Sequence, residues 1–328
     1  MEEIGGIVKA LILAGGYATR LWPVTKHKAK PLLPLVGKPI LSYILDEMED
    51  IDKINEILIA TNERFEESFK QYLSDREGEN YRLIIESQEA EGEKYGAVGG
   101  IINAIEKGGD DDYIVIGGDN YYSFKIRDFL EFAQEKDSVA NACFQVPSFE
   151  EAKNYGIVDF DEDKKIREFQ EKPENPKSRM ASTACYYYPR EKLELFDKYV
   201  DYWDGKIPEE QYLDEPGRFL EWTVERYDTY AYPFEGKWVD VGTRGGYLRA
   251  ETELRKENIV KGQVKNSEIG ENVTVLENCK IQNSEIENSI IFENCKIQNS
   301  IIKNTIVGDN TEIKNKDVRE ALIKDIEE

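Results

Sequence analysis

The chain is poor in the residues that many catalytic and metal sites require. Its 328 residues include one histidine, His27, and four scattered cysteines, with no Cys-x-x-Cys pair. A serine–histidine–aspartate triad would have to use His27, and a histidine-rich zinc site is excluded. Because the cysteines suggest no short disulfide framework, we expect a reducing, cytoplasmic environment.

Positive charge and long apolar runs are also scarce. The 43 Lys and Arg residues face 66 Asp and Glu residues, so the net charge is −23. Nucleic acids are bound by basic surfaces, which makes them poor partners for this chain. No apolar run approaches the roughly 18 residues of a membrane span, and Glu2 and Glu3 stand where a signal peptide carries positive charge. We therefore expect neither nucleic acid nor a membrane as a partner.

From Lys9 to about Tyr122, short apolar runs alternate with amphipathic stretches. Four of the runs lack polar alternation, as strands buried on both faces of a parallel sheet do. Later segments have the spacing of a mixed sheet with further helices. The pattern predicts a Rossmann-like mixed α/β sheet domain over residues 1–257. The four runs are 10–13, 57–60, 83–85 and 113–116.

After Asn258 the composition changes to Asn, Glu and Ile, and a repeat appears. The sequence ENCKIQNS occupies residues 277–284 and again 293–300, which is 16 residues later, and aliphatic residues recur every five or six positions. Three such steps form a coil of 16 to 17 residues, which predicts a three-sided parallel β-solenoid over residues 258–315 with Asn at its corners. This pattern resembles the hexapeptide-repeat left-handed β-helix, and the resemblance alone supplies the handedness.

The last residues of the chain have a different spacing. Val318, Leu322 and Ile326 recur as on one face of a helix, so residues 316–328 are predicted to form a helical cap that covers the last strand edge or packs on a neighbour. The solenoid contains no plausible catalytic base. We expect it to organise a homo-oligomer and to carry no chemistry.

A glycine pair directly follows the first apolar run. Gly15 and Gly16 allow backbone N–H groups to approach a polyphosphate without a Cβ in the way. Arg20 can then bind phosphate oxygens bidentately, and Lys30 can supply a point charge. The segment is neither a dinucleotide fingerprint, because the third glycine is missing, nor a Walker A loop, because no Gly-Lys-Ser/Thr follows.

The same segment resembles the signature of the nucleotidyltransferases that join a sugar 1-phosphate to a nucleotide. That signature reads G-G-x-G-T-R-L-x-P-x-T, followed by a P-K-P-L-L-P-like segment, and here it stands as GGYATRLWPVT and AKPLLPL, with Ala18 in place of a glycine. The resemblance implies that Arg20 and Lys30 are catalytic. It also implies nucleotide binding by Leu13, Ala14, Gly15 and Gly16.

Two further segments resemble the family's magnesium-binding motifs. GGDN at residues 117–120 matches the segment whose aspartate binds magnesium, and WVDVGT at residues 238–243 matches the segment of the second carboxylate. The resemblance implies that Asp119 and Asp240 are catalytic and hold Mg²⁺. Two carboxylates suit this cation, which prefers oxygen ligands and keeps several waters.

Other matches to the family imply contacts with the sugar phosphate and the base. Tyr-Gly at residues 155–156, Glu-Lys-Pro at 171–173 and the strand at 183–188 resemble its sugar-binding segments. The resemblance implies sugar-phosphate binding by Asn120, Gly156, Glu171, Lys172 and Tyr186. For the base, it points to Gln88, which would pair with a pyrimidine edge, and to Gly96 beside it.

These matches predict an enzyme that forms a nucleotide-diphospho-sugar and pyrophosphate from a nucleoside triphosphate and a sugar 1-phosphate. Gln88 and the overall likeness favour UTP or dTTP with glucose 1-phosphate. One alternative is a mannose-1-phosphate guanylyltransferase. Another is a noncatalytic regulatory subunit of the same fold, against which the intact set of Arg20, Lys30, Asp119 and Asp240 argues.

Overall fold

The computed structural model describes residues 6–76, 80–86 and 96–324, and the chain divides into two compact units. We call them the sheet unit and the solenoid unit. The sheet unit contains Met1–Gly16, Ile44–Gly118 and Tyr122–Trp238; the solenoid unit contains Tyr17–Tyr43, Asp119–Tyr121 and Val239–Glu328. The units interleave along the chain, so the division by packing differs from the linear boundary at residue 257 that the composition suggests.

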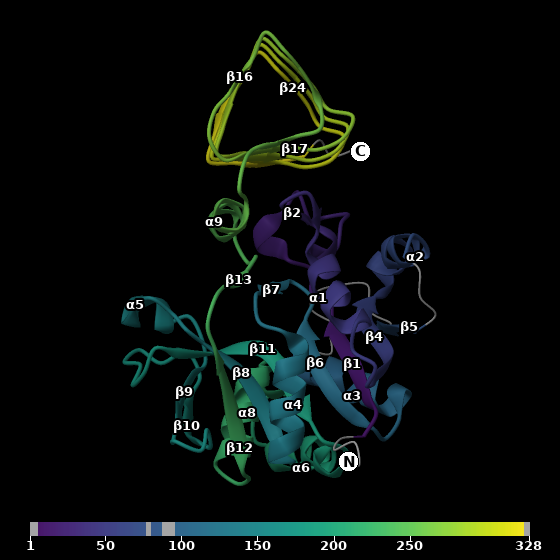
Figure 1. Cartoon of the computed structure of the whole chain (residues 1–328), viewed down its shortest axis with the longest axis vertical. Coiled ribbons are helices and arrows are strands. Elements are labelled where there is room, and N and C mark those ends of the chain that lie inside the picture. The colour runs from purple at the N-terminus through teal and green to yellow at the C-terminus, as the bar shows by residue number, and fades with distance from the viewer. Residues whose placement is uncertain (1–5, 77–79, 87–95, 325–328) are drawn as a thin grey trace. The chain divides into compact units, whose positions relative to one another are not determined.

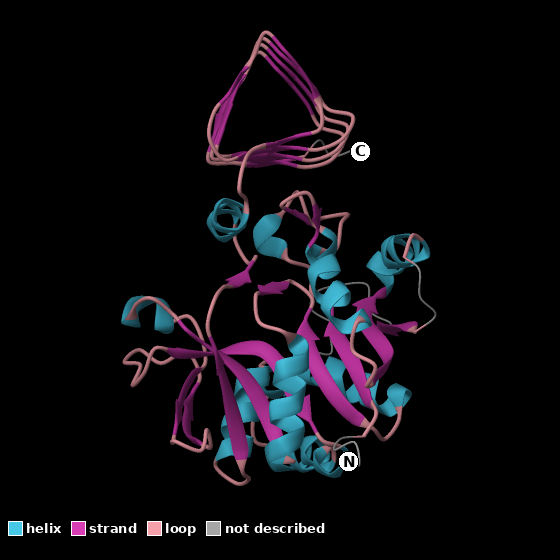
Figure 2. Cartoon of the chain, in the orientation of Figure 1, coloured by secondary structure: helices cyan, strands magenta, loops and turns pink. Residues whose placement is uncertain are grey.

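The sheet unit is built on a mixed sheet with the strand order β10-β9-β11-β6-β1-β4-β5. Its parallel part consists of β1 (Val8–Leu13), β4 (Ile54–Asn62), β5 (Tyr81–Glu86) and β6 (Asp112–Gly117). Each contains one of the four apolar runs, so the predicted Rossmann-like sheet is confirmed. Figure 2 shows these strands in magenta, flanked by helices in cyan.

Antiparallel pairing begins where β11 joins β6, and β12 and β8 extend the sheet beside β11. The remaining strands are β8 (Val139–Gln145), β9 (Ile157–Phe160), β10 (Ile166–Gln170), β11 (Met180–Tyr188) and β12 (Thr229–Phe234). The helices are α1 (Ile40–Glu49), α2 (Glu66–Ser74), α3 (Gly96–Gly108), α4 (Ile126–Lys136), α5 (Phe149–Ala152), α6 (Glu194–Trp203), α7 (Glu209–Leu213) and α8 (Pro216–Val224).

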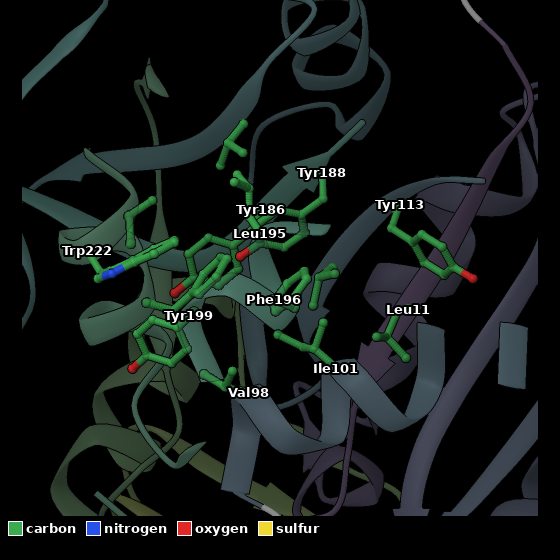
Figure 3. Close-up of a cluster of buried hydrophobic side chains, with 14 of the residues drawn as sticks. Leu11, Val98, Ile101, Tyr113, Tyr186, Tyr188, Leu195, Phe196, Tyr199 and Trp222 are labelled. Carbon is green, nitrogen blue, oxygen red and sulfur yellow. The ribbon is translucent and has the colours of Figure 1, made fainter. Parts of the chain in front are cut away.

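The largest core of the sheet unit is rich in aromatic rings. Phe196 and Phe219 stack with centroids 4.4 Å apart and an interplanar angle of 3°, and Tyr199 meets Phe219 edge-on at 5.1 Å. Figure 3 shows Tyr186, Tyr188, Phe196, Tyr199 and Trp222 gathered with the aliphatic side chains of β1 and α3. Such rings bury large areas and prefer specific mutual angles, so they fix α6 and α8 on the sheet.

In the solenoid unit, successive short strands pass through three parallel sheets in turn. The sheets are β14-β17-β20-β23-β26, β15-β18-β21-β24 and β16-β19-β22-β25. In the second sheet Ile281 pairs with Ile297, and Ile297 with Ile313, so the 16-residue repeat sets the register. Figure 1 shows the three sides as a triangle with β16, β17 and β24 on different sides. The predicted three-sided β-solenoid is confirmed, and it is of the left-handed β-helix kind.

The strands of this unit are short because each spans one side of the triangle. They are β14 (Ile259–Val260), β15 (Gln263–Lys265), β16 (Glu268–Ile269), β17 (Val273–Val275), β18 (Lys280–Gln282), β19 (Glu285–Glu287), β20 (Ser289–Ile291), β21 (Lys296–Gln298), β22 (Ile301–Lys303), β23 (Ile306–Val307), β24 (Glu312–Lys314), β25 (Asp317–Arg319) and β26 (Leu322–Ile323).

Asparagine occupies the corners of the coils. Ten asparagines between Asn266 and Asn315 have positive φ angles, from 41° to 62°. Asn tolerates this left-handed conformation better than most residues with a side chain. The side chains also form ladders between coils: Asn283 donates to Asn299 at 3.0 Å, and Asn299 donates to Asn315 at 3.0 Å. The predicted role of asparagine at the corners is confirmed.

The end of the chain continues the solenoid where its spacing predicts a helix. β25 pairs in register with β22, and β26 pairs with β23. Val318 lies opposite Ile302, and Leu322 lies opposite Ile306. A four-residue helical step differs little from the five-residue step of the solenoid, and the open edge of the preceding coil offers partners for the backbone. The expected helical cap over 316–328 therefore has strands at 317–319 and 322–323.

The first sheet of the solenoid packs against earlier parts of its own unit. Ile290, Phe292 and Ile306 lie in one buried cluster with Leu33 and with Tyr247 of α9 (Arg244–Leu254). Lys28 forms an ion pair with Asp309 at 3.2 Å. The signature segment around residues 17–43 is therefore backed by the solenoid.

A buried carboxylate joins the signature segment, α9 and the first sheet of the solenoid. Glu251 of α9 is 2% exposed and accepts hydrogen bonds from the backbone N–H of Val36 at 2.6 Å and from the Thr274 hydroxyl at 2.8 Å. It also forms an ion pair with Arg255. Polar groups buried in this way are stabilising only while each has its partner.

In the part of the chain that the structure describes, every helix is too short or too polar to span a membrane.

Candidate functional site

Lys30, Asp119 and Asp240 meet in the solenoid unit. Lys30 begins a short 3-10 helix (Lys30–Leu32), Asp119 precedes β7 (Asn120–Tyr122), and Asp240 ends β13 (Trp238–Asp240). The pairing of β7 with β13 brings the two aspartates to the same place. The Lys30 Nζ lies 2.6 Å from Asp119 Oδ2 and 3.2 Å from Asp240 Oδ1. The structure thus brings together three of the four predicted catalytic residues in direct contact.

The three charges shift one another's protonation. Burial lowers the pKa of Lys30, but the two carboxylates outweigh it and raise the pKa above its ordinary value. For Asp119, burial acts to raise the pKa, and the Lys30 ammonium more than compensates and lowers it. The pKa of Asp240 is raised by burial and by the nearby Asp119 charge, although Lys30 opposes this. Two carboxylates thus share one cation, and the cluster keeps an excess negative charge.

Residues next to the cluster hold its geometry. Asn120 is buried, and its amide donates to Asp119 Oδ1 at 2.7 Å, so it orients this carboxylate. A Cβ on Gly242 would lie 3.1 Å from Asp240 Oδ2, so glycine leaves room for that side chain. Thr243 caps α9 by accepting from the N–H of Gly246 at 3.1 Å. These contacts explain the Asn, Gly and Thr of the two aspartate motifs.

Arg20 lies near this cluster without a fixed partner. Its side chain is exposed and makes no hydrogen bond or ion pair with another described residue, while its charge acts to lower the pKa of Asp240. Ala18, two residues earlier, has a φ of +50°. That is the conformation in which glycine is favoured, so the alanine adopts the backbone of the glycine that it replaces. Arg20 is therefore placed beside the carboxylates and is free to bind an anion.

The donor set fits a hard divalent cation. Within the described residues no group of three or more His, Cys, Asp and Glu side chains could hold a metal, and Asp119 and Asp240 are a pair. Magnesium is commonly bound by one or two carboxylates, with waters and substrate phosphates as its other ligands. The Lys30 ammonium between the carboxylates shows that they converge on a cation.

The glycine pair lies at the carboxyl end of β1. In the sheet unit, the amide of Asn62 donates to the carbonyl of Gly15 at 2.8 Å, and Gly118 N–H donates to the carbonyl of Leu13 at 2.9 Å. The carboxylate of Glu86 lies against Gly15, where a Cβ would be 3.2 Å from its Oε2. Leu13, Ala14, Gly15 and Gly16 thus lie at the sheet edge where ligands of α/β proteins bind.

Glu86 was not anticipated from the sequence. It is the last residue of β5, one position beyond the predicted apolar run 83–85, and it is 7% exposed. A buried acid at the end of an apolar run is the signal that could have identified it. The predicted base-binding residue Gln88 lies outside the described residues. Gly96 begins α3 with a φ of +75°, and a Cβ there would meet the backbone of Leu213. Both the backbone conformation and the close packing therefore require glycine at this position.

The predicted sugar-phosphate residues Gly156, Glu171 and Lys172 cluster in the sheet unit. A Cβ on Gly156 would meet the ring of Phe169 and would lie 3.1 Å from Glu171 Oε2. Lys172 forms ion pairs with Glu171 at 2.8 Å and with Glu215 at 3.5 Å. Burial lowers the pKa of Lys172, but these two carboxylates outweigh it and raise the pKa. The cluster combines carboxylates that can accept hydroxyl hydrogens with one exposed ammonium.

Two members of this cluster were missed in the sequence. Glu215 faces Lys172, and Gly217 at the start of α8 leaves the space that the Glu171 carboxylate occupies. They flank Pro216 in an acidic stretch that has the pattern of an ordinary helix start, so the local sequence gave no signal. Tyr186 is 5% exposed and packs on Tyr188 in the aromatic core (Figure 3). Burial raises its pKa above the ordinary value, and a sugar contact by its hydroxyl stays a prediction.

Comparison with known proteins places this site in a family. The nucleotidyl transferase family profile matches residues 9–257, which is most of the chain and includes all three clusters. The chain belongs to the nucleotidyl transferase family. The match begins in β1, before the glycine pair, and ends beyond Asp240, so it includes segments of both compact units.

Relatives in this family act on different substrates according to their names. The bifunctional protein GlmU of Methanocaldococcus jannaschii is 28% identical over 273 residues, which cover 82% of this chain and 60% of that protein. Glucose-1-phosphate adenylyltransferase of Clostridioides difficile is 33% identical over 250 residues, covering 71% and 63%. A candidate mannose-1-phosphate guanyltransferase of Sulfolobus acidocaldarius is 29% identical over 296 residues, covering 85% and 76%. The chain thus spans about three fifths of the length of the first two relatives.

A solved structure is also similar. It is a candidate glucose-1-phosphate thymidylyltransferase of Bacillus anthracis, in complex with a sucrose, with 26% identity and a TM-score of 0.64. The similarity covers 77% of this chain and 98% of that chain. These proteins share the sugar 1-phosphate nucleotidyltransferase fold and differ in the base named, so the family is established and the base is not.

Proposed function

We propose that this chain transfers a nucleotidyl group from a nucleoside triphosphate to a sugar 1-phosphate and releases pyrophosphate. A phosphate oxygen of the sugar 1-phosphate would attack the α-phosphorus, and the bond from that phosphorus to the oxygen bridging to the β-phosphate would break. The observation that carries the proposal is the contact of Lys30 with both Asp119 and Asp240 in a member of this family.

The chemistry requires charge neutralisation more than proton transfer. The attacking phosphate oxygen is already ionised at neutral pH, so no general base is needed, and His27 has no role in the proposal. Two polyanions must be brought together in a protein with a net charge of −23. Lys30 and Arg20 supply positive charge for the triphosphate, and positioning together with electrostatic stabilisation accounts for the rate.

Asp119 and Asp240 would hold a Mg²⁺ ion, which supplies charge neutralisation and orientation at the phosphates when it is bound. Asn120 keeps the Asp119 carboxylate in position through its 2.7 Å hydrogen bond. Asn120 thus acts on the aspartate, in addition to the sugar-phosphate contact that the resemblance implies for it.

The sheet unit would bind the sugar 1-phosphate and the nucleotide. Glu171 accepts hydrogen bonds from sugar hydroxyls, and Lys172 exchanges a carboxylate partner for the sugar phosphate. The exposed position of Lys172 supports this role, because 54% of its side chain is accessible. The glycine pair after β1 holds the nucleotide. The likeness to glucose-1-phosphate relatives supports glucose 1-phosphate, and mannose 1-phosphate is the alternative sugar.

The test is a pyrophosphate-release assay with the full chain and Mg²⁺. The panel contains GTP, ATP, UTP, dTTP and CTP, each paired with glucose 1-phosphate, mannose 1-phosphate and N-acetylglucosamine 1-phosphate. We expect release with at least one pair, dependence on both substrates, and loss in excess chelator. Absence of release with every pair would overturn the proposal. Release from a triphosphate alone would indicate hydrolysis and would also contradict it.

A further inference from the structure

The carboxyl ends of β4 and β5 carry two polar side chains side by side. Asn62 ends β4, Glu86 ends β5, and the two are register partners in the parallel pair. Paired residues of parallel strands point to the same face of the sheet. The two side chains therefore lie together next to the glycine pair, where the proposed function puts the nucleotide.

Glu86 is a buried acidic residue beside the glycine pair. It is 7% exposed, and its carboxylate lies between Gly15 and Gly100, where a Cβ would be 3.2 Å and 2.9 Å away respectively. It makes no hydrogen bond or ion pair with any other described residue. The charge of Lys107 in α3 acts on it, and the Lys107 ammonium donates to the carbonyl of Ile85 at 3.3 Å. A buried carboxylate without hydrogen-bond donors lowers the stability of the folded protein, and a ligand that supplies donors removes this destabilisation.

Asn62 leaves a second acceptor without a donor. Its amide nitrogen donates to the carbonyl of Gly15 at 2.8 Å, which fixes which end of the amide is the nitrogen. Its Oδ1 is buried and has no hydrogen-bond partner, and the residue is 2% exposed. The edge thus presents three acceptor oxygens that lack a donor among the described residues, two from Glu86 and one, buried, from Asn62.

The nucleobases differ in how many adjacent donors they offer. Guanine has N1–H next to the N2 amino group, so it presents three N–H hydrogens on one edge. Uracil and thymine have one N–H between two carbonyl oxygens, and cytosine and adenine have one amino group beside an acceptor nitrogen. A carboxylate accepts two parallel hydrogen bonds from neighbouring donors. Two carbonyl oxygens facing the same carboxylate would be repelled.

We propose that Glu86, with Asn62 beside it, selects guanine, so that the nucleotide substrate of this chain is GTP. Glu86 accepts from N1–H and N2–H, and Asn62 Oδ1 accepts from the base edge. This inference rests on the proposed function and names its base. It differs from the pyrimidine preference that the sequence predicts from Gln88, which lies outside the described residues.

The protonation of Glu86 agrees with this assignment. Burial raises its pKa to about 7, and the Lys107 charge acts in the opposite direction. A guanine that donates two hydrogen bonds would hold the carboxylate ionised. The Glu86 carboxyl group would thus become ionised and gain hydrogen-bond donors when the base binds.

The test compares the binding of GTP, ATP, UTP, dTTP and CTP to the full chain with Mg²⁺ by titration calorimetry, before any sugar phosphate is added. We expect GTP to bind at least about 100-fold more tightly than the others, because a site built around hydrogen bonds discriminates strongly against a ligand that lacks them. Equal or tighter binding of UTP, dTTP, CTP or ATP would overturn the assignment.

The variant Glu86→Gln sharpens this test. A carboxamide keeps the shape but offers one acceptor and one donor, which match N3–H and a carbonyl of uracil or thymine. We expect GTP affinity to fall at least about 10-fold and the preference for GTP over UTP to shrink at least about 100-fold. Glu56→Gln, at the amino end of β4, is the matched control and should leave the preference unchanged. An unaltered preference in folded Glu86→Gln, confirmed by circular dichroism, would contradict the role of Glu86.

The outcomes also separate this inference from the proposed function. Pyrophosphate release that prefers UTP or dTTP would overturn the guanine assignment and leave the nucleotidyl transfer standing. Tight GTP binding with no pyrophosphate release from any substrate pair would support the guanine site and overturn the transfer reaction.

Discussion

The two compact units have cores of opposite character. The main core of the sheet unit contains nine buried Tyr, Phe and Trp residues, from Tyr113 to Trp222, packed at specific ring angles. The inner core of the solenoid is a ladder of Val, Ile and Cys with no aromatic ring, repeated coil by coil. In the first, each contact occurs once and joins distant parts of the chain. In the second, each contact recurs with a neighbour 16 or so residues away.

The difference bears on the residue clusters that each unit holds. Irregular packing in the sheet unit produces shaped, partly buried environments, such as those of Glu86 and Glu171. Regular stacking in the solenoid repeats the same contacts in each coil, and the charged cluster of Lys30, Asp119 and Asp240 lies on other segments of that same unit. Selectivity is therefore expected from the sheet unit and charge neutralisation from the solenoid unit. The following changes test that division.

The largest effect is expected where the solenoid unit departs from its regularity. Glu251→Ala leaves Arg255 buried without its carboxylate and removes the acceptor of Val36 N–H and the Thr274 hydroxyl. We expect the free energy of unfolding to fall by about 3–5 kcal/mol. Urea denaturation followed by circular dichroism measures it. The exposed neighbour Glu253→Ala is the control, and equal stabilities of the two variants would contradict the importance of the buried carboxylate.

The second largest effect is expected for substitutions in the charged cluster. Asp240→Asn keeps the shape of the side chain but removes one charge, and we expect kcat to fall by about 100-fold or more, since charge stabilisation at the phosphates is lost. Stability should not decrease, because burial and Asp119 disfavour the ionised form of Asp240. Pyrophosphate release and thermal unfolding are the two measurements. Asp228→Asn, an exposed partner of Lys165, should behave as wild type; a similar kcat in both variants would show that the cluster is not catalytic.

A smaller effect concerns the pH dependence of stability. The pKa of Glu86 is about 7 in the folded protein against 4.5 for an ordinary glutamate, so the folded state binds more protons between these values and loses stability as the pH rises through them. Glu86→Gln removes this loss. The variant should therefore gain about 1–3 kcal/mol relative to wild type between pH 4.5 and pH 8.

Urea denaturation of both proteins at pH 5, 6, 7 and 8, without nucleotide, measures this gain. Glu253→Gln carries the same chemical change at an exposed position and is the control for the substitution itself. A constant difference between Glu86→Gln and wild type across the four pH values would mean that Glu86 titrates as an ordinary glutamate.

The smallest effect separates binding from chemistry in the sheet unit. Lys172→Ala should raise the KM for the sugar 1-phosphate about 10-fold and leave kcat within about twofold, because its contact is made in the ground state as well as in the transition state. Steady-state kinetics at saturating triphosphate measures both constants. Lys177→Ala removes a similarly exposed lysine, paired with Glu168, and should leave the KM unchanged. An unchanged KM in Lys172→Ala would remove this residue from the sugar-phosphate site.

Much of the fold could be predicted because its signals are local. The repeat ENCKIQNS and the five- to six-residue steps specify the ladder, and the positions of asparagine specify its corners. The buried parallel strands are recognisable in the sequence as uninterrupted apolar runs. The spacing of the repeat does not predict which coil of the solenoid is the last, because Val318 and Leu322 fit the spacing of a helix and of a further coil equally well.

The candidate site was predictable only where residue type and motif coincide. Lys30, Asp119 and Asp240 carry charges in matching motifs, and the structure brings them together. Glu86 and Glu251 carry the same type of charge in no motif, and their roles arise from burial by distant segments. Burial of a single glutamate depends on the tertiary packing of several elements, which a periodic pattern does not encode.

The interleaving of the two units has a consequence for synthesis on the ribosome. The signature segment at residues 17–43 emerges early, but Phe292 and Ile306, which back it in the solenoid unit, are translated about 260 residues later. At roughly 5–20 residues per second, the interval is on the order of tens of seconds. During that time the signature segment lacks its support. A chain released early would expose Leu33 and its apolar neighbours, so chaperone binding during translation should concentrate on this segment.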